Sequence, residues 1–137
     1  MSGMLEEQSS PELVRILARE EGKFVNEIFV APDSLGDGST WDTAFSRDPQ
    51  QRFIYLADGR NQKLRIFDRA TLTELTNFGQ GGHYPGQFYS LHSIATDSKG
   101  NLYTTETYQG RRVQRFLYKG LAPVTKKEQG QPYPTGQ

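Results

Sequence analysis

The chain has 137 residues, 34% of them hydrophobic and 12% aromatic, and its sixteen basic residues balance sixteen acidic ones. Such neutrality argues against a nucleic-acid partner, because a nucleic-acid surface usually carries a strong basic excess. Fourteen glycines and no cysteine favour a turn-rich β protein without disulfides or thiolate chemistry. The apolar runs are only a few residues long, so we expect no membrane span, and the first residues show no signal peptide, which leaves the compartment open.

Short runs of strand-forming residues alternate with turns rich in glycine, proline and asparagine. They predict an all-β fold with strands at 13–18, 24–30, 41–47, 52–57, 63–68, 72–78, 91–96, 101–105 and 112–118. Residues 1–11 and 121–137 are polar, and the second segment has three prolines, so both are expected to be disordered. A helix over 11–21 is an alternative, because Ser10 and Pro11 resemble an N-cap followed by proline at the first helical position. The strand interpretation is preferred because this segment aligns with two later copies.

A four-residue sequence pattern recurs along the chain at spacings of 50 and 49 residues. Its copies are Val14-Arg15-Ile16-Leu17, Leu64-Arg65-Ile66-Phe67 and Val113-Gln114-Arg115-Phe116. A period in the forties with Gly-rich joints is typical of β-propeller blades of roughly 40–50 residues, and propellers close with four to eight blades. Residues 12–120 are therefore predicted to form a partial β-propeller, an arc of about two to two and a half four-stranded blades.

The two later units correspond position by position. Asp58 matches Glu106 at an offset of 48, while Leu64 matches Val113 at an offset of 49. We expect the seam between blades to be the core, with ten residues mostly buried: Trp41, Phe45, Ile54, Leu56, Leu64, Ile66, Leu75, Ile94, Leu102 and Val113. On this prediction Val113→Ala costs roughly 1–3 kcal/mol, as trimming a buried aliphatic side chain usually does.

The last unit carries a set of motifs: Gly86-Gln87-Phe88, Ser93-Ile94-Ala95, Asp97-Ser98-Lys99-Gly100-Asn101-Leu102-Tyr103, Glu106 and Arg112-Val113-Gln114-Arg115-Phe116. These motifs resemble the NHL-repeat family, whose propellers are usually six-bladed. The preceding unit departs from the pattern, since Pro49-Gln50-Gln51-Arg52 stands where Gly-Asn is usual. The resemblance implies a propeller fold but no particular function, because the fold hosts both scaffolds and enzymes.

A weaker similarity links residues 85–94 and 111–116 to the peptidyl-hydroxyglycine amidating lyase, a zinc propeller. It implies a zinc-ligand position at His92 and an active-site arginine at Arg112. The chain departs from that enzyme in having Leu91 where a proline precedes the histidine, and in lacking a tyrosine in the turn at 58–61. The enzyme's zinc needs three histidines, whereas this chain has two, so one chain cannot supply the whole site. Three copies around one axis would bring three copies of His92 together.

The candidate ligand-binding residues are therefore His92, Asp42 and Arg112, expected at the rim of a central channel, with His92 as a candidate zinc ligand. Each also has a structural interpretation: a rim histidine bonded to a neighbouring blade, an aspartate that caps a turn, and a solvated arginine. Asp58 and Glu106 follow the second strand of their units and are interpreted as acceptors of turn N–H groups rather than as an acid–base pair.

The leading functional hypothesis is a non-enzymatic binding scaffold, which takes a protein, a peptide or further copies of itself that complete the propeller. No cofactor is required by that hypothesis. The alternative is a fragment or protomer of a zinc-dependent, lyase-like propeller enzyme. A third hypothesis is a truncated remnant without a role of its own.

Overall fold

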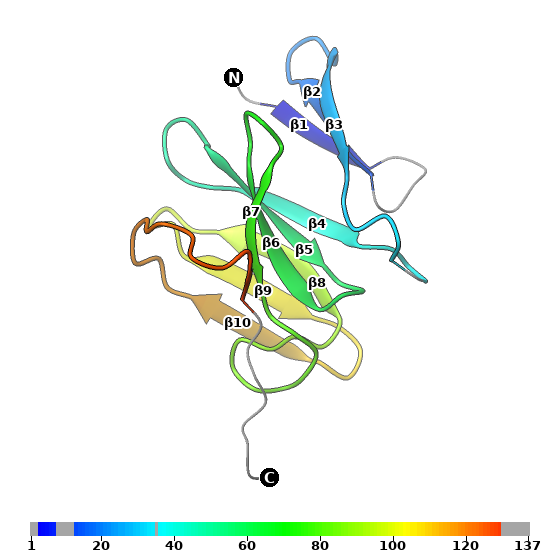
Figure 1. Ribbon diagram of the computed structural model, residues 1–137, viewed down its shortest axis with the longest axis vertical. Helices are drawn as coiled ribbons and strands as arrows, with labels where there is room; N and C mark the ends of the chain where they lie inside the picture. The colour runs from blue at the N-terminus through cyan, green and yellow to red at the C-terminus, as the bar shows by residue number, and fades with distance from the viewer. Residues whose placement is uncertain (1–2, 8–12, 35, 130–137) are drawn as a thin grey trace.

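The computed structural model describes residues 3–7, 13–34 and 36–129, and these form eleven β-strands and no helix. The strands make three separate sheets, in each of which strands consecutive in the sequence pair antiparallel (Figure 1). The all-β prediction is confirmed, and the helix proposed for 11–21 is wrong over the described part of that segment. Accordingly, no helix suited to crossing a membrane is found in the described ranges.

The first sheet consists of three strands, β1 (Gly3–Glu7), β2 (Leu13–Ala18) and β3 (Phe24–Phe29). β2 has the predicted bounds, and β3 ends one residue before its prediction. β1 pairs with the free edge of β2, although its segment was expected to be disordered. Edge pairing uses backbone donors and acceptors, which the side-chain pattern does not reveal.

The middle sheet has four antiparallel strands in chain order: β4 (Thr40–Phe45), β5 (Phe53–Asp58), β6 (Lys63–Asp68) and β7 (Glu74–Phe78). A fifth strand, β11 (Glu128–Gln129), pairs in parallel with β7. The Asn77 N–H donates to the Lys127 carbonyl at 2.8 Å, and the Gly79 N–H donates to the Gln129 carbonyl at 3.2 Å. The segment at 126–129, also expected to be disordered, therefore covers the outer edge of this sheet.

The last sheet contains β8 (Leu91–Thr96), β9 (Leu102–Glu106) and β10 (Arg112–Phe116). All nine predicted strands are present in the three sheets, and their ends shift by no more than two residues. The repeat also recurs in the irregularities of the sheets. The pairing register shifts between Ile16 and Leu17 in β2 and between Ile66 and Phe67 in β6, while the first strands β4 and β8 share a shift at their second residue.

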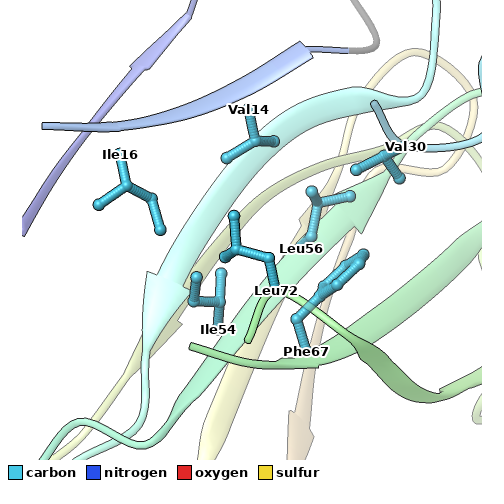
Figure 2. Close-up of a cluster of buried hydrophobic side chains, with 7 residues drawn as sticks. All are labelled: Val14, Ile16, Val30, Ile54, Leu56, Phe67 and Leu72. Atoms are coloured by element: carbon cyan, nitrogen blue, oxygen red, sulfur yellow. The ribbon is translucent and has the colours of Figure 1, made fainter. Parts of the chain in front are cut away.

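Two apolar clusters hold the three sheets together. The first contains Val14, Ile16 and Val30 from the first sheet and its exit, packed with Ile54, Leu56 and Phe67 of the middle sheet and with Leu72 of the turn between β6 and β7. Figure 2 shows these side chains pointing toward one another from the two sides. The second cluster joins the other side of the middle sheet to the last sheet and contains Ala57, Leu64, Phe88, Leu91, Ile94 and Leu102.

The sheets therefore stack in one direction. We call the face of a sheet that looks toward the next sheet along the chain its forward face, and the opposite face its backward face. Val14 and Leu64, equivalent in the repeat, lie on forward faces, while Phe67 and Phe116 lie on backward faces. Each of the two seams joins a forward face to a backward face.

Five of the ten predicted core residues are buried, namely Ile54, Leu56, Leu64, Ile94 and Leu102. Four others are partly buried: Trp41, Phe45, Ile66 and Leu75. Val113 is 66% exposed, so the prediction that it is packed is wrong. It pairs beside Thr105 on the forward face of the last sheet, and the described residues place no further sheet against that face.

Candidate functional site

His92 is the second residue of β8, where the register shift in that strand occurs, and its side chain is exposed. Its Nδ1 lies 3.1 Å from the Ser93 hydroxyl. Its ring makes an edge contact with Trp41, at 5.7 Å between centroids. Trp41 is the second residue of β4, so the two aromatic rings occupy equivalent positions in adjacent sheets.

Trp41 is partly buried because its indole packs against the turn after β5, whereas the equivalent His92 is exposed. The indole of Trp41 lies directly on Gly59, where a Cβ would come within 2.1 Å of a ring atom. Its Nε1–H also donates to the Gly38 carbonyl at 2.9 Å. In the last sheet Thr107 takes the place of Gly59 in the repeat, and its hydroxyl hydrogen-bonds the Ser90 carbonyl instead.

Asp42 connects the strand beside His92 to the last sheet. Its Oδ2 accepts a hydrogen bond from the Ile94 N–H at 2.9 Å, and its Oδ1 accepts one from the Thr43 N–H at 2.9 Å. The structure thus brings β4 and β8 side by side, as expected for two first strands. Oδ2 of Asp42 thus bonds across the seam, while Oδ1 bonds within β4.

Arg112 lies on the edge strand β10 and fastens the long joint at 79–90 to the last sheet. Its guanidinium donates to Glu106 at 2.7 and 2.9 Å, to the His83 carbonyl at 2.6 Å and to the Gln87 carbonyl at 2.7 Å. A longer bond of 3.3 Å to the Tyr84 carbonyl engages the fifth N–H group. An anion would therefore have to displace one of these acceptors, so Arg112 acts in this structure as a fastener of the joint.

The two carboxylates that follow the second strands are structural. Glu106 is buried and also accepts the Tyr89 N–H at 2.7 Å. Asp58 is fully buried and accepts the Asn61 N–H at 3.0 Å and the Arg65 Nε–H at 2.7 Å. The predicted role as an acceptor of a turn N–H group is therefore confirmed for Asp58, whereas Glu106 accepts a backbone N–H from the joint before β8 rather than from its own turn.

Arg65 is the centre of the buried polar network in the middle sheet. It bridges Asp58 and Glu74, the second at 2.9 Å. Burial alone would lower the pKa of Arg65, but the hydrogen bonds to these two carboxylates outweigh it and raise the pKa above its ordinary value. The guanidinium therefore stays charged between two carboxylates, which suits a structural bridge.

A zinc site requires several ligating side chains at one place. Among residues 13–34 and 36–129, no group of three His, Cys, Asp or Glu side chains is placed to hold a metal ion. The second histidine, His83, lies in the joint and stacks on Tyr89 with 4.9 Å between ring centroids. The side chains of one chain do not fit the three-ligand zinc centre that the resemblance implied.

A feature that the sequence did not indicate lies at the other end of the strands. The turn between β4 and β5 and the turn between β8 and β9 enclose a cleft of about 380 Å³. Its lining includes Arg47, Arg52 and Lys99, together with the aromatic rings of Tyr55 and Tyr118. Arg47 joins its two sides by donating to the Thr96 carbonyl at 2.8 Å. The cleft combines cationic and aromatic groups, but its residues belong to turns about fifty positions apart in the sequence.

Comparison with known proteins adds no family to this description. No protein-family model matches the chain, and no curated protein matches it. The fold and the site define the chain as an all-β stack of three small sheets, in which Asp42 bonds across a seam, Arg112 fastens the joint to the last sheet and His92 is exposed.

Proposed function

We propose that the chain is an arc of an NHL-type β-propeller and that it acts as a binding scaffold for another protein surface. One observation carries this proposal: the three sheets stack in a single direction, and no further sheet of the described residues lies against the outer face at either end of the stack. In a propeller each blade is covered on both faces by its neighbours. Of the three sheets that the structure describes, only the middle one has a sheet packed on both faces.

Equivalent positions have opposite exposure in the middle of the stack and at its ends. Leu64 is fully buried on the forward face of the middle sheet, whereas its counterpart Val113 is 66% exposed on the last sheet. On the first sheet, Phe24 and Phe29 are 54% and 56% exposed. Large exposed apolar groups gathered on one face are typical of interaction surfaces.

Two of the three candidate polar side chains, Asp42 and Arg112, are engaged in structural contacts, while His92 is exposed. Asp42 joins two sheets, and Glu106 and Arg112 pair with each other. This supports a scaffold over the zinc-dependent, lyase-like alternative, for which the described residues offer no three-ligand cluster. Binding through the sheet faces needs none of these residues to be free.

Site-specific photo-crosslinking tests the scaffold proposal. A photoreactive amino acid is placed at Phe29, at Val113 or at Tyr108, which is 76% exposed in the turn between β9 and β10. We expect discrete protein adducts from the two face positions and none from Tyr108. Adducts from Tyr108 alone would move binding to the strand-end rim near Arg111 and Arg112, and the absence of adducts from both faces would overturn the proposal.

A further inference from the structure

We infer that the surface which covers both bare faces belongs to a second copy of this chain, joined head to tail so that two copies close one ring. This inference rests on the proposed scaffold function and names its partner. The two seams inside the chain identify this partner, because they show that a forward face packs against a backward face.

Both internal seams join a forward face to a backward face. In the first seam, Val14 and Ile16 on the forward side meet Ile54 and Leu72. In the second seam, Leu64 on the forward side meets the cluster that contains Leu91 and Phe116. No seam in the described structure joins two faces of the same kind, so the repeat predicts that a free forward face takes a free backward face.

Within residues 13–34 and 36–129, one face of each kind has no sheet packed against it. The backward face of the first sheet exposes Phe24 and Phe29. Phe24 pairs beside the partly buried Leu17, and Phe29 pairs beside Leu13, which is itself buried. Leu17 is the counterpart of Phe67, which is 3% exposed within the first seam. Position 17 is therefore equivalent to a position that a neighbouring sheet covers in the middle of the stack.

The free forward face belongs to the last sheet. Val113 and Thr105 pair side by side on it, as do Arg115 and Tyr103. Val113 is the counterpart of Leu64, and Thr105 is the counterpart of Ala57, both fully buried in the second seam. The free face is more polar than the covered one, yet it retains apolar and aromatic groups at repeat-equivalent positions.

A contact between these two faces is heterologous, because the two surfaces differ. Heterologous contacts either close into a ring or continue into a filament. Each copy supplies three sheets, so two copies supply six, within the range of four to eight blades at which propellers close. Three copies would supply nine and exceed that range. The geometry points to a closed ring of two chains, with both kinds of free face covered.

Two variants separate a head-to-tail contact from every symmetric one. Phe29→Asp places a charge on the first-sheet face alone, and Val113→Asp places one on the last-sheet face alone. Both positions are exposed in the single chain, so folding is expected to survive, and circular dichroism checks it. Phe24→Asp and Thr105→Asp form a second pair on the same two faces, and Tyr108→Asp is the control outside them.

Sedimentation velocity over a wide concentration series gives the masses. The wild-type chain and Tyr108→Asp are expected at about 31 kDa, twice the 15.5 kDa of one chain, and each face variant alone at 15.5 kDa. An equimolar mixture of Phe29→Asp and Val113→Asp is expected to regain the 31 kDa species, since one intact contact remains between the two variants.

Three results would overturn the inference. A wild-type chain that stays at 15.5 kDa shows no self-association, and the photo-crosslinking experiment then decides the scaffold proposal independently through the mass of its adducts. A wild-type dimer whose two variants do not recombine has a symmetric contact or a contact elsewhere. A continuous series of larger species would show that head-to-tail contacts do not close.

Discussion

Arg15 and Arg65 occupy equivalent positions in the repeat, yet their ion pairs lie in different surroundings. The pair of Arg65 with Asp58 has side chains only 11% and 0% exposed, while the pair of Arg15 with Glu27 has side chains 31% and 38% exposed. A buried pair is costly to break because one charge is left desolvated, whereas an exposed pair is screened by water.

We therefore expect Asp58→Ala to lower the free energy of unfolding by about 3–5 kcal/mol, because the buried guanidinium of Arg65 loses its closest partner. The matched change Glu27→Ala is expected to cost less than about 1 kcal/mol. Urea titration of both variants, at a concentration where the chain is monomeric, measures the difference. Equal losses would show that the middle sheet does not bury this pair.

The exposure of the Val113 side chain also changes the stability loss expected for Val113→Ala. In the monomer, Val113→Ala is expected to change stability by no more than about 0.5 kcal/mol, as surface substitutions usually do. Its repeat counterpart is fully buried, so Leu64→Ala is expected to cost about 2–5 kcal/mol. Urea titration of the two variants provides the comparison, and a large loss for Val113→Ala would place another element over the last sheet.

The candidate site could be predicted from the sequence only in part. The position of His92 near the start of a first strand follows from the period, because repeat spacing fixes where strands begin. The bonds of Arg112 do not follow from it, since they depend on the path of the joint at 79–90. Four glycines and a proline leave that path without a side-chain pattern. The cleft between turns was missed for a similar reason, since its walls meet only after the sheets stack.

At the scale of elements, the same turn is built twice, with an aspartate at its centre. Asp48, between β4 and β5, accepts hydrogen bonds from the Ser46 hydroxyl and the Arg52 N–H, which lower its pKa. Asp97, between β8 and β9, accepts bonds from the Asn101 side chain and N–H, which lower the pKa of this carboxyl as well. In both turns the ionised carboxylate organises the backbone.

These turns make stability fall in acid. The folded-state pKa of each carboxyl lies below its unfolded value of 3.8, so this stabilisation is complete above about that pH and is lost as pH falls through the folded-state pKa. We expect the double variant Asp48→Asn, Asp97→Asn to lose less stability than the wild type between neutral pH and pH values below 3.8. Unfolding titrations at several pH values measure this difference. If the free energy of unfolding fell equally in the wild type and the double variant below pH 3.8, the prediction would be contradicted.

The sequence predicted the strands of the repeat well because each combines strand-forming side chains with marked turns. β1 and β11 were missed because they join sheet edges through backbone groups, and polar side chains gave no signal. The first unit was predicted with two strands, and β1 adds a third, so that β1, β2 and β3 form one sheet.

At the scale of the whole molecule, the central claim is that three repeated sheets stack forward face to backward face. Nuclear Overhauser contacts between methyl groups test it most directly, and the Phe29→Asp variant keeps the sample free of head-to-tail contacts. We expect contacts from Val14 and Ile16 to Leu72 in the first seam and from Leu64 to Leu91 in the second, with none from Val113 to either cluster. Contacts from the methyl groups of Val113 to either apolar cluster, or the loss of one seam, would contradict it.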